Sequence, residues 1–215
     1  GVSSMEIKKN SFGLHLTYAT VMLFPSILFL IVKNNTLLFY ATLFCSLLGV
    51  ATMFYLNKKN AYKNNLEKKT TTVFRSLLWG IGGAIVALVL QHFSLIVETG
   101  ILGQSVSSQN TAEALAIMRR YPFYLVYLVG AAPLMEEFVF RKVLFGNLGT
   151  LIPPIGAALI SSILFSIAHA DGHFLTYALL GLFFCYLYRK TGRLLTSMTA
   201  HILMNAIIIV LQFVI

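Results

Sequence analysis

Charged side chains are scarce in this chain. Of its 215 residues, 11% are Asp, Glu, Lys or Arg and 58% are hydrophobic, and the mean hydropathy is +0.81. Too few charges are present to solvate a water-soluble globule of this length. Long apolar runs separated by short polar connectors instead predict an all-α, polytopic transmembrane helical bundle.

Cysteine and acidic residues are also scarce. Cys45 and Cys185 are the only two cysteines, and no C-x-x-C spacing exists. Both lie inside apolar runs, which indicates two buried thiols rather than redox chemistry.

The net charge of +9 arises from basic residues in connectors that lack interleaved aromatic side chains. We therefore expect no nucleic-acid partner.

The apolar runs divide into seven expected spans, and a count of six or eight also fits the pattern. Their ranges are 14–32, 36–56, 76–97, 122–145, 155–170, 174–188 and 194–215. With a cytoplasmic N-terminus and seven spans, all of the 16 Lys and Arg residues except Lys33, Arg119 and Arg120 lie on the cytoplasmic side. The positive-inside rule therefore predicts this orientation.

Three parts of the chain differ in character. Residues 1–4, ahead of Met5, read as an expression scar, and residues 5–120 form a variable set of N-terminal spans that ends in an amphipathic connector. Residues 121–215 form the core of the last four helices, which carries the polar clusters. In the connector, Asn110 and Glu113 resemble a capping box and predict a short helix that guards an entrance or simply joins two spans.

Two adjacent glutamates, Glu136 and Glu137, interrupt one of the apolar runs. Each charge costs about 2.5–3.5 kcal/mol at the centre of a membrane helix, which favours a functional role. Glu137 and Arg141 are four residues apart and share a helix face, so we expect them to pair and Glu136 to stay free for chemistry. The alternative is a purely structural ion pair. Pro133 predicts a kink or break beside Glu136.

Two further patterns place histidines in apolar helices. Phe165 and His169 form F-x-x-x-H, and His201 and Asn205 form H-x-x-x-N. If the helices on either side of the Pro-Pro turn near residue 153 are antiparallel, Glu136 and His169 both lie about 25 Å from that turn. We therefore expect the glutamate, both histidines and the asparagine to meet at a similar depth.

The three patterns, taken in this order within residues 120–210, resemble the CAAX-protease and bacteriocin-processing family of intramembrane glutamic endopeptidases. Its eukaryotic members trim prenylated CAAX proteins, and its bacterial members include bacteriocin self-immunity and peptide-processing proteins. The resemblance implies that Glu136 is the catalytic glutamate, that His169 helps to hold and activate water, and that His201 and Asn205 stabilise the oxyanion. It implies supporting positions at Glu137, Arg141 and Phe165.

On this reading the chain is an integral protein of the bacterial plasma membrane that needs no cofactor. Its partners are membrane lipids and a hydrophobic, lipidated or prenylated peptide substrate. One alternative is a zinc-dependent membrane metalloprotease whose ligands are Glu136, His169 and His201. Another is a non-catalytic self-immunity or scaffold protein that binds a peptide partner.

Overall fold

The computed structural model describes residues 4–104 and 109–214, and every regular element in these ranges is helical. This confirms the predicted all-α class. The α-helices are α1 (Ser4–Ile31), α2 (Asn35–Asn60), α3 (Val73–Leu102), α4 (Gln109–Arg120), α5 (Ala132–Glu136), α6 (Pro154–His169), α7 (Phe174–Thr191) and α8 (Leu194–Val214). The elements η1 (Asn65–Lys68) and η4 (Leu148–Thr150) are short 3₁₀-helices.

The helix that carries both glutamates is unusual because most of it has π-helical winding. Elements η2 (Val126–Ala131) and η3 (Glu137–Asn147) are π-helices that continue directly into either end of α5, and we call the three together the central helix. Pro133 lies at the start of α5, where the chain stays helical instead of breaking. The wider i→i+5 winding on both sides is typical of functional sites, and the sequence pattern did not predict it.

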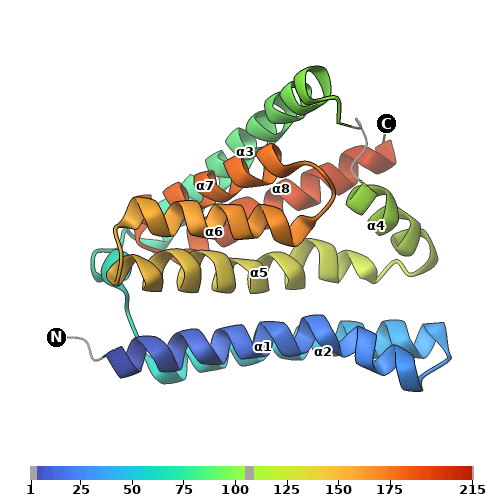
Figure 1. Cartoon of the computed structure of the whole chain (residues 1–215), viewed down its shortest axis with the longest axis horizontal. Helices are drawn as coiled ribbons and strands as arrows, with labels where there is room; N and C mark the ends of the chain where they lie inside the picture. The colour runs from blue at the N-terminus through green and yellow to red at the C-terminus, as the bar shows by residue number, and fades with distance from the viewer. Residues whose placement is uncertain (1–3, 105–108, 215) are drawn as a thin grey trace.

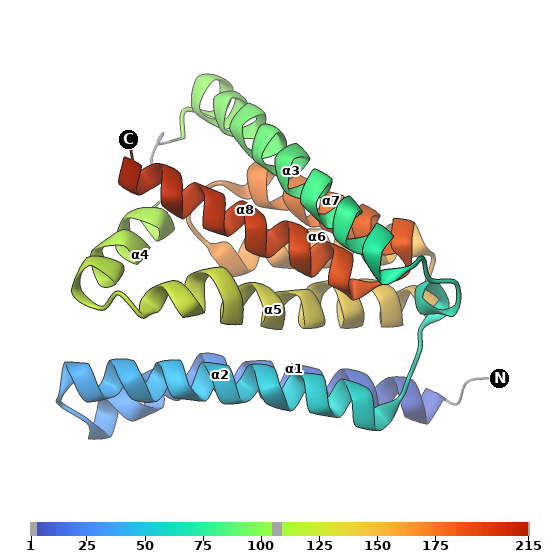
Figure 2. The same cartoon turned by 180° about the vertical axis from the view of Figure 1, so that it is seen from behind.

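The helices pack around the central helix (Figure 1). The α1–α2 hairpin lies along one side of it, and α6 returns antiparallel to it on the other side after the turn at Pro153. Helices α3, α7 and α8 form the remaining layer, in which α3 packs against both α7 and α8 (Figure 2). All seven predicted apolar helices are therefore present, with α4 as an additional short helix.

The outer faces of the bundle are apolar. Leu30, Phe44 and Val89 are each more than 60% exposed on the outer faces of α1, α2 and α3. Such surfaces fit a lipid environment and not water. By length and composition, four of the described helices can cross a membrane, namely Met5–Ile31, Asn35–Asn60, Val73–Ile101 and Leu194–Gln212. The total number of spans stays a prediction.

Most of the basic residues belong to segments that lie at the end of the bundle where the N-terminus lies (Figure 1). This end includes the start of α1, the end of α2, the connector around η1 and the α7–α8 turn, whereas Arg141 is buried inside the bundle. Lys33, Arg119 and Arg120 follow α1 or end α4, at the opposite end. If the positive-inside rule holds, this basic end is the cytoplasmic one, and the orientation stays a prediction.

Single-cysteine labelling tests this orientation. In a background with Cys45→Ala and Cys185→Ala, we expect Ala116→Cys on α4 to react with a membrane-impermeant maleimide in intact cells. Lys63→Cys, beside η1, serves as the matched control and should react only after permeabilisation, because both positions are exposed but lie at opposite ends. The reverse labelling pattern would show that the basic end faces outward.

Candidate active site

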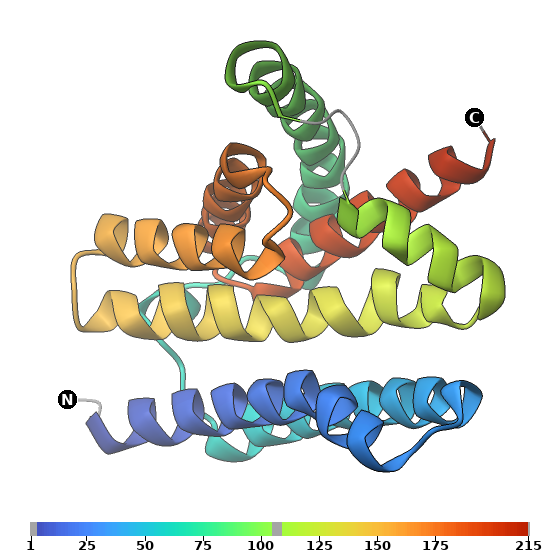
Figure 3. The ribbon, with the colours of Figure 1, turned by 45° about the vertical axis from the view of Figure 1, so that its right-hand side comes forward.

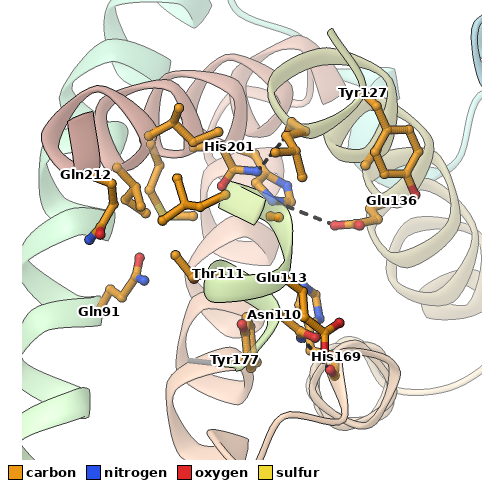
Figure 4. A pocket seen from close by; sticks show the side chains of 18 of the residues that line it. Gln91, Asn110, Thr111, Glu113, Tyr127, Glu136, His169, Tyr177, His201 and Gln212 are labelled. Carbon is orange, nitrogen blue, oxygen red and sulfur yellow. Dashed lines mark hydrogen bonds and ion pairs between the residues drawn. The ribbon is translucent and has the colours of Figure 1, made fainter. Parts of the chain in front are cut away.

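All four polar residues that the motifs single out line one pocket of about 330 Å³. The central helix supplies Glu136, α6 supplies His169, and α8 supplies His201 (Figure 4). Asn205 also belongs to α8. The volume lies within the range of small-ligand sites in proteins. The structure therefore brings the four residues together at one pocket.

The two adjacent glutamates lie in different surroundings. The side chain of Glu136 is 18% exposed and faces the pocket, where its Oε2 lies 3.7 Å from Nε2 of His201. The side chain of Glu137 is fully buried behind the pocket wall. Only Glu136 is therefore open to a substrate or to water.

Glu137 holds a buried charge cluster together. Its Oε1 lies 3.5 Å from Nε of Arg141 and 2.9 Å from Nδ1 of His201, and both Glu137 and Arg141 are fully buried. The guanidinium of Arg141 lies over the rings of Phe165 and Phe184, 4.3 Å and 5.1 Å from their centroids. The predicted pairing of Glu137 with Arg141 is confirmed, and cation–π contacts add to its stabilisation.

The hydrogen bond to Glu137 determines which nitrogen of His201 carries a proton. A carboxylate only accepts hydrogen bonds, so Nδ1 of His201 donates to Glu137. The ring also stacks on Phe184, with centroids 4.8 Å apart, which fixes its orientation. Nε2 therefore faces Glu136 with a lone pair in the neutral ring, and it can donate a hydrogen bond only when both ring nitrogens carry a proton.

His169 is held by its own helix and by α7. Its Nδ1 lies 2.8 Å from the carbonyl oxygen of Phe165, and a carbonyl only accepts, so Nδ1 carries the proton. Its ring stacks on Tyr177 of α7 with centroids 3.9 Å apart. Nε2 is then an acceptor suited to bind and orient water. Phe165, through its carbonyl and its ring, thus contacts both His169 and Arg141.

Asn205 lies one turn beyond His201 on α8. Its Nδ2 donates to the carbonyl oxygen of Leu128 in η2, at 3.1 Å, which ties α8 to the π-helical part of the central helix. That bond uses one of the two N–H groups of the amide. The amide is therefore oriented beside the pocket with donor capacity remaining.

Comparison with known proteins identifies the family. The family model for type II CAAX prenyl endopeptidases of the Rce1-like group matches residues 119–207, which contain all three motifs. The membrane-embedded CAAX protease MroQ of Staphylococcus aureus (strain USA300) is 31% identical over 182 residues, which are 80% of this chain and 73% of MroQ. The chain belongs to the Rce1-like family.

A second relative is the putative membrane peptidase YdiL of Bacillus subtilis (strain 168), which is 35% identical over 138 residues. These residues are 64% of this chain and 57% of YdiL, so the chain spans somewhat more than half the length of this relative. No solved structure matches the chain. Together with the apolar helices, these likenesses make the chain an integral membrane protein of the Rce1-like family.

The sequence motifs missed the part of this Rce1-like pocket that α4 supplies. Asn110, Thr111 and Glu113 of α4 line it, and Nδ2 of Asn110 donates to the carbonyl oxygen of His169 at 2.6 Å. Asn110 therefore lies inside α4 and ties it to the end of α6, instead of capping α4 as predicted. The amphipathic pattern predicted the helix and left open whether it guards an entrance or only joins two spans, but nothing local in the sequence indicated its contact with α6 (Figure 3).

A buried carboxylate of α3 was also missed. Glu98 is 1% exposed and accepts from the backbone N–H of Leu175, at 2.5 Å, and from Oγ1 of Thr176, at 2.7 Å. Nδ1 of His173 lies 3.2 Å from its Oε2. A negative charge at the N-terminus of a helix is stabilising, so Glu98 fixes the start of α7 and, through it, Tyr177 beside His169.

The zinc alternative receives no support from the spacing of the side chains. Glu136, His169 and His201 line the same pocket. Within residues 4–104 and 109–214, however, no group of three His, Cys, Asp or Glu residues is arranged to hold a metal ion. That alternative therefore rests on residue types alone, and chelation is its test.

The buried charge cluster of this family member makes a testable prediction about stability. Arg141→Met leaves the Glu137 carboxylate without its cation, so we expect a loss of about 3–5 kcal/mol in the free energy of unfolding. The double variant Glu137→Gln/Arg141→Met removes both charges and should recover at least half of that loss, as measured by unfolding in detergent micelles. If the loss in the double variant equalled the sum of the losses in the two single variants, the pairing of Glu137 with Arg141 would be contradicted.

Proposed function

We propose that the chain is an intramembrane endopeptidase that cleaves a peptide bond in a hydrophobic, lipidated or membrane-associated peptide. The observation that carries this proposal is the convergence of Glu136, His169, His201 and Asn205 on one pocket. Family membership supports it, since the two relatives are named a putative membrane peptidase and a membrane-embedded CAAX protease.

Each residue has a distinct role in the proposed reaction. A water molecule bound by Glu136 and Nε2 of His169 loses a proton to the Glu136 carboxylate while its oxygen attacks the scissile carbonyl carbon. The carbonyl oxygen becomes an oxyanion, which accepts hydrogen bonds from Nε2–H of the His201 imidazolium and from Nδ2 of Asn205. Glu136 then gives its proton to the leaving nitrogen as the C–N bond breaks.

The pocket lining supports a peptide substrate. Leu128, Ile208 and Ile209 provide apolar surface, and Gln91 and Gln212 provide amide groups that can hydrogen-bond a peptide backbone. A CAAX-type or prenylated C-terminus, or a peptide leader, meets this description. The bacterial sources of both relatives support a location in a bacterial plasma membrane.

The position of α4 supports access from the end of the bundle opposite the basic residues. Helix α4 lies across the pocket (Figure 4). The basic residues lie at the other end of the bundle, which the positive-inside rule assigns to the cytoplasm. We therefore propose that substrates enter from the non-cytoplasmic side or from the outer leaflet.

Glu136→Gln tests the proposed base. We expect cleavage of a mixed hydrophobic and prenylated peptide library by purified protein in lipid to fall about 10²–10⁴-fold, because the amide cannot accept the proton of water. Glu6→Gln is the control, because Glu6 is an exposed glutamate at the far end of the bundle. A chelator should leave wild-type cleavage unchanged.

Each other outcome has its own meaning. Loss of wild-type cleavage with chelator would favour the zinc-dependent alternative over water activated by Glu136. Cleavage retained in Glu136→Gln would contradict the proposed base. If no sample cleaves any peptide while wild type still binds some of them, the non-catalytic binding protein replaces the peptidase.

Asn205→Leu tests the proposed oxyanion donor. The two side chains are similar in size, but leucine donates no hydrogen bond, so kcat should fall about 10²–10³-fold while KM changes little. Steady-state cleavage of one identified peptide measures both constants. A rise in KM with unchanged kcat would instead make Asn205 a substrate-binding residue.

A further inference from the structure

A second pocket, of about 500 Å³, lies at the basic end of the bundle. The end of α2, the connector around η1, the end of the central helix and the α7–α8 turn all contribute to it. Four cationic side chains line it against a single carboxylate, Glu67; they are Lys58, Lys63, Lys142 and Arg193. The positive-inside rule accounts for basic residues at this end of the bundle, but neither it nor the proposed peptidase chemistry accounts for their gathering around one pocket.

Both oxygens of the single carboxylate already have partners. Its Oε2 pairs with the buried ammonium of Lys142 and accepts from the backbone N–H of Asn64. Its Oε1 accepts from the hydroxyl of Tyr188 at 2.9 Å. The single negative charge of Glu67 is therefore paired with Lys142, and the other cations of the pocket outnumber it.

The other three cations lack an acidic partner. Among the described residues, Lys58, Lys63 and Arg193 take part in no ion pair. Nε of Arg193 donates to the carbonyl oxygen of Thr71 at 2.6 Å, which positions the guanidinium and leaves its terminal nitrogens for another acceptor. Three unneutralised cations around one hollow attract an anion.

Close backbone contacts join two of the segments that form this pocket. Gly192 has a φ of +69°, and an added Cβ there would lie 2.5 Å from the carbonyl oxygen of Lys69 and 2.6 Å from that of Leu66. The backbone N–H of Thr71 also donates to the carbonyl oxygen of Thr191, at 2.9 Å. The α7–α8 turn, which carries Arg193, is thus held against the η1 connector.

We propose that this basic pocket binds a phosphate group. Arginine and lysine around a hollow are the usual phosphate ligands, and basic pockets between helices on the cytoplasmic side bind the head groups of anionic lipids. An anionic phospholipid or a soluble phosphate presents the same chemistry to Lys58, Lys63 and Arg193. The proposal does not depend on the peptidase activity, because the pocket shares no residue with the active-site pocket.

Binding is measured with purified full-length protein in micelles of a neutral detergent. The probes are phosphatidylglycerol, phosphatidylcholine and inorganic phosphate, and the readouts are the shift in melting temperature and the number of lipids retained in native mass spectrometry. The test variant is Lys58→Gln/Lys63→Gln/Arg193→Gln. The matched control, Lys8→Gln/Lys9→Gln/Arg75→Gln, removes the same charge from exposed side chains at the same end but outside the pocket.

We expect phosphatidylglycerol to raise the melting temperature of wild type and of the matched control, and phosphatidylcholine to leave it unchanged. The test variant should lose at least two thirds of that rise. If millimolar inorganic phosphate gives the same rise with the same loss in the test variant, the site is confirmed and its ligand is a soluble phosphate. A rise with phosphatidylglycerol but not with inorganic phosphate would identify the ligand as an anionic phospholipid.

Equal losses in the two triple variants would overturn the proposal, because net charge alone would then explain binding. No rise in wild type with either phosphate probe would overturn it as well. The charge-conserving variant Lys58→Arg/Lys63→Arg/Arg193→Lys should keep the response. Should the test variant fail to fold, Lys63→Gln alone, at an exposed position, should weaken phosphatidylglycerol binding about fivefold; unchanged affinity would contradict the site.

Discussion

The rest of the site depends on the buried carboxylate of Glu137. It contacts Arg141 on its own helix and Nδ1 of His201 on α8, so one charge joins the central helix to α8. A buried charge of this kind is tolerable only when its partners are in place. The relative position of the two helices, and with it the approach of His201 to Glu136, is therefore determined by this cluster.

Aromatic side chains and helix ends complete the arrangement. The Phe165 ring packs against the Arg141 guanidinium, and the Phe165 carbonyl oxygen accepts a hydrogen bond from Nδ1 of His169. The same cluster therefore also positions α6. Tyr177 stacks on His169 from α7, whose start Glu98 of α3 holds in place. Helices from the whole bundle thus shape the pocket, although the family match and the motifs lie in the second half of the sequence.

The helices and the meeting of the motif residues were predictable because apolar runs have a required length and polar groups in a membrane must be satisfied. The i,i+4 spacing likewise predicted the pair of Glu137 and Arg141. The π-helical winding on either side of Pro133 was not predictable, because it reflects packing between helices. The docking of Asn110 on His169 and the contact of Glu98 with α7 join residues more than 50 positions apart, for which a single sequence carries no signal.

The most direct test of the account is the cleavage rate under single-turnover conditions together with the melting temperature, for Glu136→Gln and Glu137→Gln side by side. The account predicts that Glu136→Gln keeps the wild-type melting temperature and loses cleavage, because Glu136 faces the pocket and its contact with His201 of α8 is long, at 3.7 Å. Glu137→Gln should lower the melting temperature, because its charge joins two helices. Cleavage retained by Glu136→Gln, or a melting temperature unchanged by Glu137→Gln, would contradict the account.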